Sequence, residues 1–300
     1  MKDDIADDWK NQMSIIVDDI PFDCIGFGTQ NSIKIELAMK NASDQANVVL
    51  MEEPENNLSY ANMALLVSHI QDSKEKQVFI STHSSYIANK LNLDNLILVN
   101  QGNIIQYKNL GDDTKRYFVK LPGYDTLRFV LANSVILVEG PTDDLIIQRA
   151  YKDKNGHLPI EDGIDIIVVD SLAFKRYLDI AKMMKKKVKV VTDNDGDINK
   201  NIKEKYRDYI NDSLFSFFYE QNENLNTIEP SVLAVNSENG IPNDTFKEVI
   251  SKNGSNKNKS YEEILEFMKN NKVEWACRVF ESSQNIKYPE YIQNAIEEYC

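Results

Sequence analysis

Short apolar runs alternate with stretches of helical periodicity through the second half of the chain. Three runs are rich in β-branched residues, at Val135–Val138, Ile164–Val169 and Val188–Val191. Helical patterns lie between them, from Leu145 to Lys154 and from Leu172 to Met184. Strands that alternate with helices in this way predict βαβ units and a mostly parallel sheet flanked by helices. The predicted fold class is therefore α/β.

The first half repeats this alternation on a smaller scale. Val48–Met51 and Val78–Ile80 predict two strands, and a helical pattern runs between them from Leu58 to about Ser73. Residues 109–124 carry mixed charges and predict a linker. Three hundred residues suffice for about two domains, and we divide the chain into residues 1–120 and 121–300.

Composition indicates that the chain can form buried cores and in which compartment we expect it. With 42% apolar residues, the chain has ample material for buried cores. It has no run of 18 or more apolar residues, so we expect no membrane partner and a cytoplasmic protein. Cys24, Cys277 and Cys300 match no zinc-binding spacing and fit reduced thiols in a cytosol.

The net charge of −13 is not typical of a general nucleic-acid binder. Metal ions and local basic patches can nevertheless attract a phosphate backbone. Two lysine-rich stretches are the candidates for such a patch, and solvated helix faces are the alternative interpretation. They are Lys182, Lys185, Lys186, Lys187 and Lys189, then Lys200, Lys203, Lys205 and Arg207.

Acidic residues follow two of the predicted strands in the second half. Glu139 follows the first run, and Asp193 and Asp195 follow the third. In parallel sheets the functional site lies at the carboxyl ends of the strands, so these side chains should meet there. Asp143 falls on the first turn of the next helix, close to Glu139. Carboxylate oxygens are preferred ligands of Mg²⁺, and the pattern favours metal-dependent phosphoryl transfer over a solvated turn.

A glycine-containing loop precedes a helical pattern near the N-terminus. Its sequence is Gly26-Phe27-Gly28-Thr29-Gln30. Free N–H groups at the start of a helix can bind an anion, although a glycine turn before an ordinary helix is the commoner arrangement.

Two acids and a histidine follow the strands of the first half. Glu52 and Glu53 close the first strand and His83 follows the second. In an ATPase-like layout, one acid positions Mg²⁺, the next activates water and the histidine contacts the γ-phosphate. No G-x-x-x-x-G-K-[ST] phosphate-binding loop occurs in the chain. We therefore expect that the chain does not bind and hydrolyse ATP alone.

These motifs resemble two known domains. Glu139-Gly140-x-x-Asp143 with Asp193-x-Asp195 resembles the Toprim domain of topoisomerases, primases and certain nucleases. Gly26 to Gln30 resembles the signature loop of ABC-type ATPases, Val48 to Glu53 resembles Walker B, and His83 resembles the switch histidine. Glu52 departs from the commoner aspartate, and the signature-like loop lacks its usual serine. The resemblance implies the C-terminal half of an ABC-type ATPase domain, then a Toprim domain with a helical tail.

The order of the motifs resembles the OLD (overcoming lysogenisation defect) family of nucleases over roughly residues 22–300, and the anti-phage Gabija nuclease subunit has a similar organisation. Thr227-Ile228-Glu229 and Asn271–Ala276 also resemble the tail of that family. Only this resemblance assigns Glu229 to the metal site and Lys272 to the transition state. The missing phosphate-binding loop implies a fragment of a longer protein, or a first half supplied by another chain.

The resemblance implies a DNA endonuclease that hydrolyses phosphodiester bonds with two Mg²⁺ (or Mn²⁺) ions. Asp193 and Asp195 would bind one ion, and Glu139, Asp143 and Glu229 the other, with Glu139, Asp193 and Lys272 as the catalytic residues. It further implies ATP control in the complete protein, a homo-oligomer (dimer or larger), a possible partner defence protein and a role in anti-phage defence.

Other functions remain open at this point. The main alternative is an ATP-gated DNA-binding or assembly module whose Toprim fold is not catalytic. A phosphatase with Asp193 as nucleophile would leave Glu139 and Lys272 unexplained. A topoisomerase would need a separate DNA-binding domain with an attacking tyrosine, and a primase would need nucleotide-binding elements, neither of which is recognisable in the sequence.

Overall fold

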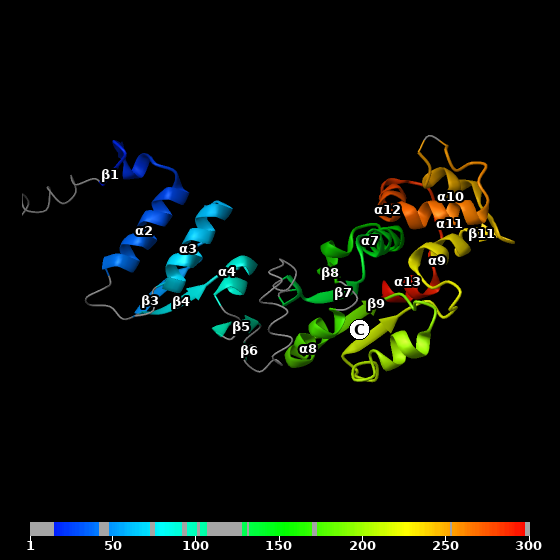
Figure 1. The fold of residues 1–300 in the computed structure, drawn as a ribbon, viewed down its shortest axis with the longest axis horizontal. Helices are drawn as coiled ribbons and strands as arrows, with labels where there is room; N and C mark the ends of the chain where they lie inside the picture. The colour runs from blue at the N-terminus through cyan, green and yellow to red at the C-terminus, as the bar shows by residue number, and fades with distance from the viewer. Residues whose placement is uncertain are drawn as a thin grey trace, which may run out of the picture. The chain divides into compact units, whose positions relative to one another are not determined.

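A parallel sheet of four strands forms the centre of the second half of the chain (Figure 1). The strands are β7 (Ser134–Val138), β8 (Ile164–Val168), β9 (Val188–Val191) and β10 (Phe215–Phe218), in the order β10-β9-β7-β8. Every neighbouring pair is parallel. The computed structural model therefore confirms the mixed α/β fold with a parallel sheet and flanking helices.

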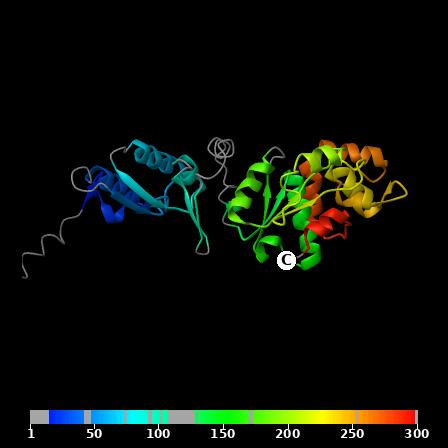
Figure 2. The ribbon, with the colours of Figure 1, turned by 90° about the horizontal axis from the view of Figure 1, so that it is seen from below.

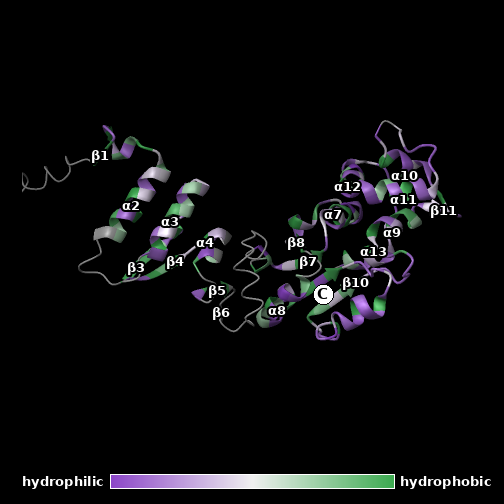
Figure 3. Ribbon diagram, viewed as in Figure 1, coloured by the Kyte–Doolittle hydropathy of each residue, from purple (hydrophilic) through white to green (hydrophobic). Residues whose placement is uncertain are grey.

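Both faces of this sheet are covered. Ile136 and Val138 pack into one core cluster with residues of α7 (Pro141–Asn155). Val135 and Leu137 point to the opposite face, because side chains alternate along a strand, and they are also fully buried. Burial on both faces explains why the strands are continuous apolar runs rather than alternating ones. Figure 2 shows helices on both sides of the sheet, and Figure 3 shows the hydrophobic colour of its strands.

α8 (Phe174–Met184) and the short α13 (Glu290–Ala295) are two further helices of the second half. α13 packs on β9, β10 and α7. Between β10 and α13 the chain forms a helical tail. Its elements are α9 (Ile228–Val235), β11 (Ser237–Glu238), β12 (Ile241–Pro242), α10 (Asp244–Val249), α11 (Tyr261–Asn270) and α12 (Lys272–Glu281).

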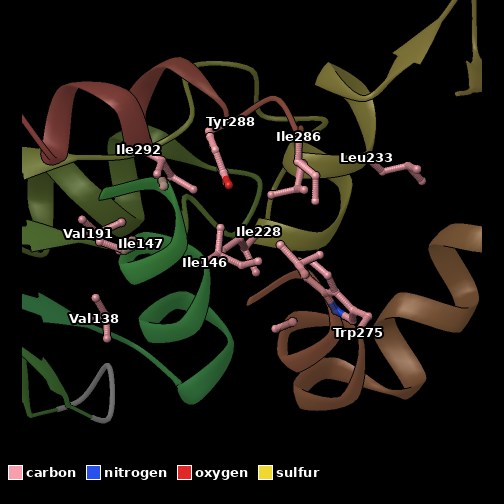
Figure 4. Packing of buried hydrophobic residues seen from close by; sticks show 14 of the residues in the cluster. Val138, Ile146, Ile147, Val191, Ile228, Leu233, Trp275, Ile286, Tyr288 and Ile292 are labelled. Atoms are coloured by element: carbon pink, nitrogen blue, oxygen red, sulfur yellow. The ribbon is translucent and has the colours of Figure 1, made fainter. Parts of the chain in front are cut away.

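One core joins the sheet to this tail (Figure 4). Ile146 of α7, Ile228 and Leu233 of α9 and Trp275 of α12 belong to the same buried cluster, and Trp275 has no exposed surface. Residues far apart in sequence therefore share one core, and the tail packs on the sheet domain as part of one unit.

The first half contains a parallel pair of strands, β3 (Val48–Glu52) and β4 (Gln77–Ser81). Its helices are α2 (Phe27–Asn41), α3 (Tyr60–Asp72) and α4 (Ser85–Lys90). β1 (Ile16–Val17) and β2 (Ile20–Pro21) form a hairpin, which a 3-10 turn at Phe22–Cys24 follows. β5 (Ile97–Asn100) pairs with β6 (Asn103–Gln106), and a further 3-10 turn lies at Pro159–Asp162 in the second half.

The strand pair is apolar on a face that stays exposed. Leu66, Val67, Ile70 and Ile87 from α3 and α4 form a small core. Val48, Leu50 and Phe79 are instead 48%, 77% and 52% exposed. Parallel sheets are normally covered on both faces, so this apolar strand face lacks the cover that the sheet of the second half has.

The structure describes residues 15–41, 48–72, 76–91, 95–100, 103–106, 128–130, 132–169, 173–252 and 254–297. These fall into two compact units, one mainly Met1–Leu96 and the other mainly Asp125–Cys300. The predicted linker, residues 109–124, lies outside the described residues, as does Cys300. Cys24 and Cys277 are free thiols. Within the described ranges, no helix combines the length and apolarity needed to cross a membrane.

Candidate functional site

Glu139 lies directly after β7 and is held by the end of the neighbouring strand β9. Its Oε1 atom accepts a hydrogen bond from the Thr192 hydroxyl and another from the backbone N–H of Asp193, at 3.1 Å. Leu137 and Val190 are partners across the two strands, so both strands reach the same edge of the sheet. Two donors from the β9 end thus orient the Glu139 carboxylate.

Asp143 is fixed at the start of α7. Gly140 is the N-cap of this helix and Pro141 its first residue, where a missing N–H leaves no lost bond. The Asp143 Oδ2 atom accepts a hydrogen bond from the Gly140 N–H at 3.1 Å. The side chain therefore folds back toward the strand end, which places it near Glu139 as predicted from the sequence.

The loop after β9 is anchored through the buried Asn194. Its Nδ2 atom donates to the Glu220 carbonyl at 2.8 Å, and its Oδ1 atom accepts from the Gly196 N–H at 2.8 Å. Asp195 and Gly196 have positive φ angles of 49° and 78°. Asp195 is exposed in this tight turn, while the preceding Asp193 is half-buried.

Asp197 has a different role from the two acids before it. Its Oδ1 atom accepts a hydrogen bond from the Lys200 N–H at 2.9 Å, at the start of the π-helix Asn199–Glu204. The Asp197 carboxylate thus binds the backbone at the start of this helix.

Glu229 and Lys272 come from two helices of the tail. Glu229 lies in the first turn of α9, is 1% exposed, and accepts a hydrogen bond from the Thr227 hydroxyl at 2.7 Å. Lys272 begins α12, and its Nζ atom lies 3.7 Å from Glu229 Oε1. A carboxylate that sequence reasoning alone would place on the surface is therefore buried, with an ammonium group beside it.

The carboxylates influence one another electrostatically. Burial raises the pKa of Asp143 to about 7, and the charges of Glu139 and Glu229 add to this rise. Burial also raises the pKa of Asp193 to about 9, with further contributions from Asp143, Glu139, Glu229 and Asp195. The other four acids predicted for the metal site therefore all lie within electrostatic reach of Asp193.

This donor set fits a divalent cation. Hard cations such as Mg²⁺ take carboxylate oxygens, and a cation removes the repulsion that keeps such groups protonated. Among the residues that the structure describes, no three His, Cys, Asp or Glu side chains already have the geometry of a formed metal site. The acids are thus assembled as a group but are not closed around a common point.

Comparison with protein families agrees with this geometry. Residues 130–195 match the family model of the Overcoming lysogenization defect protein-like TOPRIM domain. The match spans Glu139, Asp143, Asp193 and Asp195, whereas Glu229 and Lys272 lie beyond it. TOPRIM domains act on nucleic acids and generally use divalent metal ions such as Mg²⁺. A comparison with curated proteins finds no match.

The first unit brings together two of the residues predicted to be ATP-related. The Nε2 atom of His83 lies 2.9 Å from Oε1 of Glu53, which has a positive φ of 43°. Glu52 ends β3 and is exposed. Glu55, which the sequence did not single out, accepts hydrogen bonds from the backbone N–H groups of His83 and Ser84, both at 3.1 Å. This acid connects the loops that follow the two strands.

The glycine loop packs against the loop after β3. α2 begins directly after Gly26, and buried Gln30 donates to the Ile25 carbonyl at 3.0 Å. A Cβ atom at Gly28 would lie 2.2 Å from the Asn57 carbonyl oxygen. Gly28 is therefore required for this close approach, a structural role that the sequence interpretation did not include.

Two of the lysines suggested for a basic patch donate to backbone carbonyls instead, and that interpretation is wrong for them. Lys186 donates to the carbonyl of Ala132 at 2.6 Å, and Lys189, 9% exposed, donates to the carbonyl of Ala295 at 3.0 Å. Their positive charges neutralise helix and loop carbonyls rather than face solvent.

Sequence reasoning also missed the hydroxyls that hold the carboxylates. Thr192 and Thr227 each donate to an acid of the site. A threonine next to or two residues from a candidate ligand was the available signal, since outer partners of this kind orient the ligands of many metal sites.

Alanine substitution at Gly28 and at Gly26 tests the close packing of the glycine loop. We expect Gly28→Ala to destabilise the first unit by about 1–3 kcal/mol, because the new methyl group overlaps the Asn57 backbone. Gly26→Ala is the matched control, since nothing lies within 4 Å of its Cβ position. Thermal unfolding measures both, and equal melting temperatures for the two variants would contradict the close packing.

The raised pKa values predict how stability depends on pH in protein without metal. Asp143 and Asp193 bind protons more tightly when folded than when unfolded, where carboxyl pKa values are about 3.9. Stability is therefore highest below the unfolded pKa and falls as pH rises toward about 9. We expect Asp193→Asn to raise stability at pH 8 by on the order of 1 kcal/mol and to flatten this slope. Denaturant unfolding from pH 5 to 9 tests this, and a parent whose stability rises over that range would refute it.

Proposed function

We propose that this chain is a metal-dependent DNA endonuclease that hydrolyses phosphodiester bonds. The observation that carries the proposal is the group of five carboxylates at the carboxyl edge of the parallel sheet, with the Lys272 ammonium beside the buried Glu229. The match to an OLD-like TOPRIM domain supports a nucleic acid as the substrate class.

The residues divide into metal ligands and a cation for the phosphate. Asp193 and Asp195, on one loop, would hold one Mg²⁺ or Mn²⁺ ion, and Glu139, Asp143 and Glu229 would hold a second. When bound, two such ions supply an activated water and stabilise the leaving oxygen. Thr192 and Thr227 keep the Glu139 and Glu229 carboxylates oriented.

Lys272 has two roles in this proposal. Without substrate, its ammonium lies 3.7 Å from Glu229 and partly offsets the buried negative charge. Its side chain is 59% exposed, so it can also approach a phosphate and stabilise the charge that develops there.

We further propose that the first unit is part of an ATPase domain that controls cleavage in the complete protein. The Glu53–His83 pair after neighbouring strands supports this assignment. The exposed apolar face of Val48, Leu50 and Phe79 supports association, either with the rest of such a domain or within a homo-oligomer. A partner protein and a role in anti-phage defence are extensions of the same proposal.

The competing function is a DNA-binding or assembly module without cleavage. Burial of Asp143 and Glu229 among like charges favours the nuclease, because a module that only binds DNA gains nothing from that cost.

Plasmid cleavage tests the proposal directly. Supercoiled plasmid is incubated with the protein and Mg²⁺ or Mn²⁺, without ATP, and nicked and linear products are quantified. We expect cleavage by the parent and a loss of at least about 100-fold in Asp193→Ala, because removing a ligand should exceed the effect of removing an outer partner.

Asp197→Ala is the matched control for this experiment. It removes a carboxylate four residues away that accepts the Lys200 N–H at the start of the π-helix, so cleavage should persist. Cleavage that survives in Asp193→Ala would exclude the proposed site. Metal binding and DNA binding without cleavage by any form would favour the DNA-binding module.

A further inference from the structure

Arg149 of α7 binds the chain at the end of another helix. Its side chain is almost fully enclosed, with 4% of the residue exposed. Nη1 donates to the carbonyl oxygens of Val279 at 2.5 Å, Phe280 at 3.4 Å and Ser282. Nη2 donates to the Gln284 carbonyl at 2.9 Å. One guanidinium therefore holds four backbone carbonyls.

These carbonyls lie at the C-terminal end of α12 and just beyond it. The last carbonyls of a helix have no partner within the helix, and a positive charge is favourable there. The planar guanidinium can reach several of them at once, whereas a lysine ammonium is a single point. Arg149 thus caps α12 from a neighbouring helix.

A carboxylate and a tyrosine hold the guanidinium in place. Asp153, one turn later in α7, accepts a hydrogen bond from Arg149 Nε at 2.7 Å. The Tyr288 hydroxyl donates to the other oxygen of Asp153 at 2.5 Å. Arg149 therefore has little freedom to move relative to α7 or to the segment after α12.

The two helices that Arg149 joins both lead to the carboxylate site. α7 and α12 pack against each other, α7 carries Asp143 in its first turn, and α12 begins with Lys272. At 1.5 Å per residue, Asp143 lies about 9 Å along α7 from Arg149, and Lys272 about 14 Å from the far end of α12. A helix behaves as a stiff rod over such lengths, so a clamp at one end of α12 sets the place of the other.

We propose that Arg149 is a positioning residue that holds the Lys272 ammonium at Glu229 by fixing α12 to α7. Its effect on cleavage rests on the proposed nuclease function, whereas its effect on metal affinity does not. Lys272 competes with a cation for Glu229, so displacement of α12 should both impair cleavage and release that carboxylate.

Arg149→Lys tests the role in catalysis, since it keeps the charge but cannot span four carbonyls. We expect kcat for plasmid cleavage to fall about 10–100-fold, as for other residues that orient a reacting group, with a smaller change in KM for DNA. In a Lys272→Ala background the same substitution should have little further effect, because the residue through which it acts is gone.

Mn²⁺ titration calorimetry without DNA gives a second, independent measurement. We expect Lys272→Ala and Arg149→Lys each to tighten Mn²⁺ binding by about threefold to tenfold, and the double variant to bind no more tightly than Lys272→Ala. Asp153→Asn removes only the carboxylate that holds Arg149 Nε. It should change kcat and Mn²⁺ affinity in the same direction as Arg149→Lys, but by less. This variant replaces Arg149→Lys if that protein does not fold.

Lys186→Met is the matched control for general destabilisation. Lys186 also donates to backbone carbonyls, those of Phe129, Val130 and Ala132, but these carbonyls do not belong to α12. It should lower the melting temperature and leave kcat and Mn²⁺ affinity unchanged.

Two results would overturn the positioning role. One is an effect of Arg149→Lys that is equally large with and without Lys272, and the other is unchanged Mn²⁺ affinity in Arg149→Lys. A parent that never cleaves DNA but shows the non-additive Mn²⁺ result would refute the nuclease and retain the positioning role.

Discussion

Repulsion between buried carboxylates is the constraint around which the second unit is arranged. The buried Asp143 and the half-buried Asp193 lie beside Glu139 and Glu229, and this environment raises the pKa of both. Neighbouring groups partly compensate this negative charge. Threonine hydroxyls and backbone N–H groups donate hydrogen bonds to the carboxylates, and the Lys272 ammonium lies beside Glu229. A site of this kind is electrostatically incomplete as a protein alone, and a divalent cation is the simplest group that completes it.

Such a site needs a rigid scaffold, because repulsion would otherwise move the carboxylates apart. The sheet supplies part of it, since Glu139 and Asp193 follow strands that are buried on both faces. The shared core supplies the rest, because Ile146, Ile228 and Trp275 pack together from three helices that carry or adjoin site residues. Dense packing transmits small displacements, so contacts well away from the carboxylates can alter their spacing.

The sequence predicted the parts of this arrangement that depend on local pattern. Strands buried on both faces leave continuous β-branched runs, and acids placed directly after them could be assigned to one edge of the sheet. Contacts between distant residues leave no such pattern. Arg149 meets the Ser282 carbonyl 133 positions away, and Lys189 inside β9 looked like a solvated lysine although it caps the end of α13. Glu229 was assigned only by resemblance, because one acid at the start of a helix has no distinctive local signal.

The burial of Trp275 has a practical consequence. The chain has two tryptophans, and the other is Trp9, near the N-terminus. Trp275 lies in α12, three residues after Lys272, in a water-free environment between the tail helices and the sheet domain. Indole emission is blue-shifted where water is excluded, so the native protein carries its own optical reporter of α12. A Trp9→Phe background would isolate that signal and make loosening of this helix visible in real time, without a label.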